Sequence, residues 1–255
     1  MQAWQIFVQS VLRIVNNFEG ALRVSAVLYL MIVALGLALQ MLGIPDLSDR
    51  DQLKALLEAG RFPWIPFILI YLASAICALW IAVGWHRFIL LDENPGIVPP
   101  LNGGRLFAYF LRGLLVGLIL IPIYLVFVLL MFGLAVATRG NLPDIVLTLL
   151  PIAIVIPASM IFLRLSVALP GAALGAEGGI LDTWEKTRGT MGTFLALTLI
   201  LGAFGVAAGL VTLLFLNVPL LLMFWSYLYG WVSLMVGVSI LTTLYGHYVE
   251  KRALT

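Results

Sequence analysis

The sequence predicts an all-α, polytopic integral membrane protein: a helical bundle of six transmembrane helices arranged as three hairpins, with additional interfacial amphipathic helices. Two observations predict this class. Hydrophobic residues make up 63% of the chain and charged residues only 10%, with a mean hydropathy of +1.12, whereas soluble domains carry about 25% charged residues. The apolar runs also reach the roughly 20 residues that a helical span needs, without the alternation typical of outer-membrane barrels. We therefore expect a single membrane domain over residues 1–255.

Residues 1–20 have the periodicity of a one-sided helix. Apolar residues recur three and four positions apart, with polar residues such as Gln5, Gln9 and Arg13 between them. The apolar positions are Trp4, Phe7, Val8, Val11, Leu12, Val15, Phe18 and Leu22. We expect an amphipathic helix lying in the membrane interface, with a docking helix for a partner as the alternative.

Six apolar runs follow this helix, and we expect them to be the spans. They cover about residues 21–42, 64–85, 113–137, 145–169, 193–216 and 221–245. With the N-terminus inside, ten Lys and Arg residues fall in inner segments and four in outer ones. The inner ten are Arg13, Arg23, Arg87, Arg105, Arg112, Arg164, Lys186, Arg188, Lys251 and Arg252, and the outer four are Arg50, Lys54, Arg61 and Arg139. This bias predicts that both termini are cytoplasmic.

The first outer loop predicts a short amphipathic helix. Ser48 and Asp51 have the spacing of a capping box, Leu53 and Leu57 share one face, and Gly60 follows as a stop signal. We expect this helix to lie on the outer surface.

Prolines occur within the third and fourth spans. Pro122, Pro151 and Pro157 are expected to kink or locally open these helices, and discontinuous helices build the binding sites of several transporters. No charged residue falls at the predicted midplane, where ion-coupled transporters usually keep one. Bending for packing is the alternative explanation of the prolines.

A charged segment interrupts the apolar C-terminal half and predicts a second interfacial helix. Asp182 and Lys186 are four residues apart, Glu185 and Arg188 three apart, and Trp184 lies on another face. We expect Trp184 at headgroup level, with the two cations near lipid phosphates.

Two arginines are predicted at the inner ends of spans. Arg87 and Arg164 need partners there or must reach into the interface, and nearby carboxylates can supply them. The candidate residues of this charged cytoplasmic face are Arg87, Asp92, Glu93, Arg164, Asp182, Trp184, Lys186 and Arg188. They are expected either to bind lipid or a partner protein, or to clamp the helices together.

Other chemistry has little support in the sequence. The single cysteine, Cys77, is in an apolar run, and the two histidines have no metal-ligand spacing around them, so we expect no cofactor and no metal site. The charge of +2 is dispersed, which argues against nucleic acid. No nucleophile motif is present, so we expect no enzyme. A membrane-embedded enzyme would have to bring His86, Asp92, Glu93 and Asp182 together.

Three short groups of residues form a pattern. They are Trp85, Arg87, Leu90, Asp92, Glu93 and Pro95, then Arg164, Ser166, Leu169 and Pro170, and then Asp182, Trp184, Thr187, Arg188 and Gly189. This pattern resembles that of bacterial six-span proteins of YciC type and of the membrane domain fused to some glycerophosphodiester phosphodiesterases. The resemblance implies a bacterial inner-membrane protein with three helical hairpins. It implies no catalytic residues, because in those fusions the hydrolytic site is on a separate soluble domain.

The expected function is therefore that of a non-enzymatic inner-membrane protein, an accessory, organising or lipid-associated factor. It would act through its charged cytoplasmic face on membrane lipids and on other membrane proteins. The alternative is a transporter, channel or lipid-moving protein that uses the proline-containing third and fourth spans.

Overall fold

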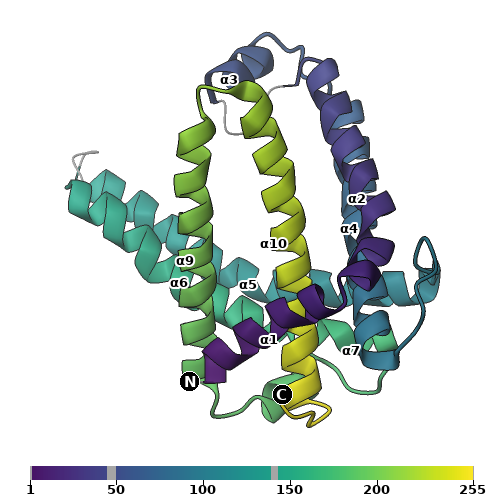
Figure 1. The fold of residues 1–255 in the computed structure, drawn as a ribbon. Coiled ribbons are helices and arrows are strands. Elements are labelled where there is room, and N and C mark those ends of the chain that lie inside the picture. Colours follow the sequence, from purple (N-terminus) through teal and green to yellow (C-terminus); the bar gives the residue numbers. More distant parts are fainter. Residues whose placement is uncertain (1, 45–49, 139–142, 255) are drawn as a thin grey trace.

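The computed structural model describes residues 2–44, 50–138 and 143–254, which form helices and connecting segments without strands (Figure 1). The helices are α1 Gln2–Asn16, α2 Phe18–Met41, α3 Arg50–Glu58, α4 Trp64–Leu91, α5 Gly103–Ala137, α6 Asp144–Ser166, α7 Leu169–Leu174, α8 Ile180–Lys186, α9 Met191–Phe215 and α10 Pro219–Tyr248. Six segments among them are long and apolar enough to cross a membrane: α2, α4, α5, the α6–α7 segment, α9 and α10. The predicted fold class is confirmed.

The spans pair in chain order as three hairpins. Helix α2 packs along α4, α5 contacts α6, and α9 contacts α10. Figure 1 shows the α5/α6 hairpin extending away from the other two. Helix α5 has 35 residues and is therefore about 52 Å long. The hydrocarbon core is about 30 Å thick, so α5 must tilt strongly or project beyond it.

Helix α1 crosses α9 and α10 at the end of the bundle that carries both chain termini (Figure 1). We call this end the inner end; that it is cytoplasmic stays a prediction. Its buried face is Ala3, Ile6, Ser10 and Ile14. The Ser10 hydroxyl donates to Thr243 Oγ1 at 2.9 Å. Phe7 and Val11 are half-buried against the core, whereas Trp4 and Val15 are 59% exposed and Leu12 is 42% exposed. The helix therefore has one face for the bundle and another available to lipid.

Several helices extend beyond the predicted spans. Helix α5 begins at Gly103, ten residues before the predicted start at 113, and α4 continues to Leu91, six residues past 85. The additional helical turns contain polar residues, so a span predicted from hydropathy does not include them. They are helical because they pack against other elements at the inner end. As a result Arg87, Arg105 and Arg112 are helical residues rather than loop residues.

The prolines do not interrupt their helices. Pro122 lies inside α5, and Pro151 and Pro157 lie inside α6, with helical backbone on both sides. The helices are therefore not opened at these prolines, and a kink stays a prediction. Pro170 stands in the first turn of α7, where its missing N–H costs nothing.

The outer loop contains a helix where one was predicted. Helix α3 covers Arg50–Glu58, and Gly60 follows with φ of 62°, a left-handed conformation that glycine adopts readily. The predicted cap Ser48 lies outside the described residues.

The core is concentrated at the inner ends of the spans. Buried residues begin at Cys77 in α4 and at Met235 in α10. At the centre of this core, the fully buried His86 ring lies 2.8 Å from Thr242 Oγ1 through Nδ1 and 3.2 Å from the Tyr109 hydroxyl through Nε2. Three hairpins are thus joined at one depth by packing and by a satisfied polar group.

Candidate functional site

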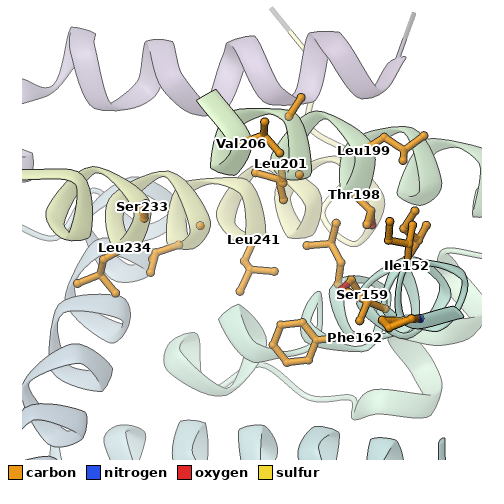
Figure 2. A pocket seen from close by; sticks show the side chains of 18 residues that line it. Ile152, Ser159, Phe162, Thr198, Leu199, Leu201, Val206, Ser233, Leu234 and Leu241 are labelled. Carbon is orange, nitrogen blue, oxygen red and sulfur yellow. The ribbon is translucent and has the colours of Figure 1, made fainter. Parts of the chain in front are cut away.

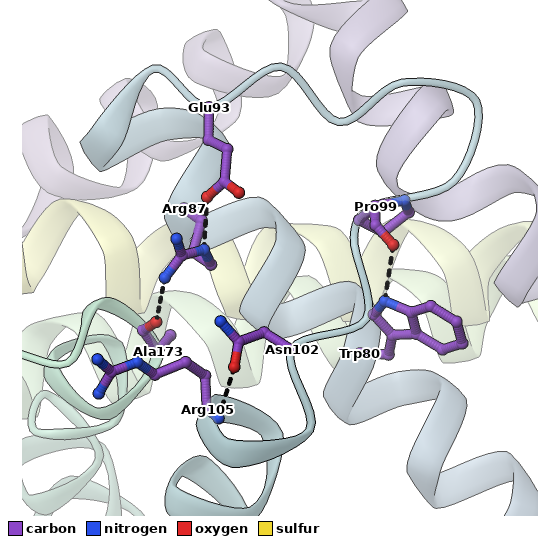
Figure 3. A network of polar contacts seen from close by, with 7 residues as sticks. All are labelled: Trp80, Arg87, Glu93, Pro99, Asn102, Arg105 and Ala173. Carbon is purple, nitrogen blue, oxygen red and sulfur yellow. Dashed lines mark hydrogen bonds and ion pairs between the residues drawn. The ribbon is translucent and has the colours of Figure 1, made fainter.

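The first group of predicted site residues joins α4 to α7. Arg87 Nε donates to Glu93 Oε2 at 2.5 Å, and its Nη1 donates to the Ala173 carbonyl at 3.1 Å (Figure 3). The loop between α4 and α5 is held by Trp80 Nε1, which donates to the Pro99 carbonyl at 3.0 Å. Arg87 thus links the loop after α4, through Glu93, to α7, through the Ala173 carbonyl. Both roles expected for these residues, the clamp and the binding of lipid or a partner, stay predictions.

Two further arginines reach α7, and sequence reasoning did not select them. Arg112 donates from Nη1 to the Ala168 carbonyl and from Nη2 to the Gly178 carbonyl, both at 3.1 Å. The Arg105 guanidinium lies against the backbone of Gly175, where a Cβ would come within 2.1 Å of its atoms. The signal available was their position near an inner helix end.

Arg164 is almost fully buried, with 5% of its surface exposed. Its Nε donates to Thr187 Oγ1 at 3.0 Å, and its Nη2 donates to the Trp184 carbonyl at 2.9 Å. The guanidinium carbon lies 3.6 Å from the centroid of the Trp184 ring. Its Nη1 donates to Met191 Sδ at 3.0 Å. Among the described residues no carboxylate forms an ion pair with Arg164, and Glu185 of α8 acts on it only at longer range.

Helix α8 carries the exposed charges of this face. Lys186 Nζ lies 2.9 Å from Asp182 Oδ2, and Arg188 Nη1 lies 3.7 Å from Glu185 Oε2, so both predicted pairs form. The Arg188 side chain remains 83% exposed, and Leu181 is 81% exposed. Trp184 packs under Arg164 and is half-buried, so it is Leu181 that presents an apolar side chain to the surroundings.

The candidate acid–base residues have separate partners. His86 contacts Thr242 and Tyr109, Glu93 contacts Arg87, and Asp182 contacts Lys186. Asp92 is exposed and ends α4 in a left-handed conformation with φ of 53°. Within residues 2–44, 50–138 and 143–254, no group of three or more His, Cys, Asp or Glu side chains could hold a metal ion.

The C-terminal tail closes the inner face. Arg252 Nη2 donates to the Leu90 carbonyl at 2.8 Å, and Arg252 Nε lies 2.6 Å from Glu250 Oε2. Burial, together with the positive charge of Arg252, lowers the pKa of Arg13 in α1 below its ordinary value. Arginine remains charged at neutral pH despite such a shift.

A large apolar groove lies between α6, α9 and α10, and Figure 2 shows side chains of the three helices around it. Its lining runs from Pro151 to Leu163 on α6, from Thr198 to Val206 on α9 and from Ser233 to Leu241 on α10. Its volume is about 990 Å³, at the upper end of the range for small-molecule sites. We call it the α6/α9/α10 groove.

The groove is open along its side. Exposed fractions at its rim are 48% for Ile152 and Phe162, 50% for Leu199 and 65% for Val206. In spans that cross a bilayer, such a lateral opening faces lipid. Polar side chains in the lining are confined to Ser159, Thr198 and Ser233, so this groove is not a hydrophilic path.

The chain has no significant match among protein-family models, curated proteins or solved structures. The resemblance to the YciC-type proteins therefore stays a prediction.

Proposed function

We propose that this chain is a non-enzymatic, multi-pass protein of the bacterial inner membrane that assists or organises other membrane components by holding lipid at its charged inner face. The observation that carries the proposal is a difference in exposure and bonding among the cationic side chains. Arg87, Arg112 and Arg164 donate to protein atoms, while Lys186 and Arg188 are more exposed, next to the exposed Leu181.

The exposed part of α8 fits the interface of a bilayer. A cation beside an apolar side chain matches a lipid phosphate above the acyl region. Arg188 is 3.7 Å from its carboxylate partner and 83% exposed, and such a surface pair contributes little free energy. A lipid phosphate can therefore compete for Arg188. Helix α1 supports the same role, because Trp4 and Val15 are exposed opposite its buried face.

Native mass spectrometry tests this proposal. The protein would be released from nanodiscs containing phosphatidylglycerol and phosphatidylethanolamine. We expect retained phosphatidylglycerol, reduced several-fold by the double variant Lys186→Gln, Arg188→Gln. The outer pair Lys54→Gln, Arg61→Gln removes the same charge and should change nothing. Equal retention in both variants would contradict a lipid site on α8, and a stoichiometric second protein without lipid would indicate a protein partner instead.

The second candidate is a lipid-moving protein. The α6/α9/α10 groove favours this role over that of a carrier of ions or hydrophilic solutes. Of its 18 lining residues, fifteen are apolar, three are Ser or Thr and none is charged. Transfer of a fluorescent phospholipid between vesicles with and without the protein tests this role. A rate equal to that of empty vesicles would rule it out.

A further inference from the structure

We infer that the α6/α9/α10 groove is a binding site for one acyl chain of an inner-leaflet phospholipid, whose ester group lies beside Ser159 and Thr198 and whose phosphate meets Arg188. This inference rests on the proposed lipid association and deepens it by assigning the lipid a site. Four observations carry it: the depth of the groove, its lining, its unpaired hydroxyls and the charge at its inner end.

The depth of the groove matches one leaflet. Its lining runs from Thr198 to Val206 on α9 and from Ser233 to Leu241 on α10, which is about 12 Å along each helix axis. One leaflet contributes about half of the roughly 30 Å hydrocarbon core. On α9 the lining starts at Thr198, seven residues after the inner end at Met191. The groove therefore occupies the inner half of the bundle and continues to its middle.

The lining suits a hydrocarbon chain. Branched aliphatic residues dominate it, with Phe162 at the rim. Gly202 and Gly237 widen it, since a Cβ at either position would meet no atom within 4 Å. Burial of acyl carbons is favourable relative to water, but membrane lipid offers the same apolar surroundings. Specific retention must therefore come from polar contacts and from shape.

The hydroxyls in the groove provide polar contacts that the protein leaves unused. Other hydroxyls in the spans donate to the carbonyl four residues earlier, as Ser25 does to Ala21 and Thr212 to Ala208. Thr198 Oγ1 and Ser233 Oγ are buried without a partner among the described residues. A buried hydroxyl without a partner is unfavourable, so an acceptor brought by a ligand would be favoured.

Thr198 and Ser159 line the same groove. Thr198 is seven residues from Met191, the inner end of α9, or about 10 Å along the axis. The ester oxygens of a phospholipid lie at the boundary of the hydrocarbon core and can accept from both hydroxyls. Ser233 is deeper, where an acyl chain has no acceptor, so Ser233 is assigned no role in binding.

The charge at the inner end favours an anionic phospholipid. Leu163 of the groove precedes Arg164, which donates to Thr187 and to the Trp184 carbonyl. Arg188 directly follows Thr187 and is 83% exposed. A chain lying in the groove thus emerges beside a cation, which complements the lipid phosphate.

Photo-cross-linking tests the site. The protein would be reconstituted in nanodiscs with phosphatidylglycerol that carries a diazirine on one acyl chain. We expect cross-links to concentrate on residues 151–163 and 198–206, and to fall at least fivefold in the variant Gly202→Leu, Gly237→Leu, which fills the groove. Gly209→Leu is the matched control, because Gly209 is in α9, outside the lining, and equally uncrowded.

A second variant guards against misfolding. Thr198→Val with Ser159→Ala keeps the groove open, and we expect it to lower cross-linking two- to fivefold, while Ser233→Ala leaves it unchanged. Cross-links spread evenly over all spans, or unaffected by both variants, would overturn the site while leaving lipid retention on α8 intact. Cross-links between two copies at this groove would also overturn it. Loss of all lipid retention, in the wild-type chain as well, would refute the proposed function itself.

Discussion

The inner and outer halves of the same six spans differ in how they are held. In α10 no residue before Met235 is buried, whereas eleven are buried from Met235 onward. In α2 the buried residues end at Leu28, and in α5 they end at Leu120. In the inner half α1 contacts α9, α10 and α2, and α7 contacts α5, α4 and α10 (Figure 1), while α8 packs on α6. Among the described residues, no such short helix packs between the spans in the outer half.

The difference shows that polar contacts and small helices, rather than apolar content, decide where this bundle is packed. Lipid is as apolar as leucine, so apolar surface alone does not drive helices together in a bilayer. The inner half has hydrogen bonds from Arg87, Arg112 and Arg164 to backbone carbonyls and the contacts of His86. The α6/α9/α10 groove lies where this packing gives way to the open outer half.

The largest effect is expected for Arg164→Ala. Removal of the guanidinium ends its hydrogen bonds to Thr187 and Trp184 and its stacking on the Trp184 ring. We expect a loss of about 3 kcal/mol in the free energy of unfolding, measured by SDS titration in mixed micelles. Arg61→Ala in the exposed outer loop is the control and should be neutral. Equal small effects for both variants would show that α8 is not held by Arg164.

A leucine pair on α10 compares packing directly. Leu244 is fully buried in the inner half, and Leu228 in the outer half is 41% exposed. We expect Leu244→Ala to cost about 2 kcal/mol, because a cavity forms that lipid does not reach, and Leu228→Ala less than about 0.5 kcal/mol. The same SDS titration measures both. Similar costs would indicate that the outer half is packed as well.

The smallest expected difference between the two halves is in the coupling energy of two ion pairs. The Arg87–Glu93 side chains are 21% and 33% exposed, whereas the outer pair Lys54–Glu58 is 74% and 68% exposed with 3.7 Å between Nζ and Oε1. Double-mutant cycles with alanine should give a coupling of about 1 kcal/mol for the inner pair and about 0.3 kcal/mol for the outer one. A larger coupling at the outer pair would contradict the predicted clamp.

The six spans could be predicted from the sequence because hydropathy and the length of an apolar run are local properties of the chain. Residues such as Asp182 and Lys186 were also predictable as a pair, since their spacing on a helix brings them together. The division into inner and outer halves was not predictable in this way. Leu228 and Leu244 are the same residue, and only the surrounding helices decide which of them faces lipid.

The candidate site residues were likewise predictable only where their contacts are local in the sequence. Arg87 and Glu93 are close in sequence and were foreseen as partners, but the burial of Arg164 under α8 depends on how the segment after α7 returns to α6. Arg105 and Arg112 were missed because α5 begins earlier than its apolar part. The groove depends on the angle of the α5/α6 hairpin, which no local pattern in the chain encodes.

The most direct test is a spin-label scan along α10 in nanodiscs, on a Cys77→Ala background, with one nitroxide at each position from 219 to 248. Molecular oxygen concentrates in lipid, so its collision rate with the label reports lipid exposure. We predict only shallow minima before residue 235, where side chains are half-buried at most, and from there deep minima on the buried face with a helical period. A periodic minimum of equal depth in the outer half would contradict the account, because it would show that the outer half is packed too.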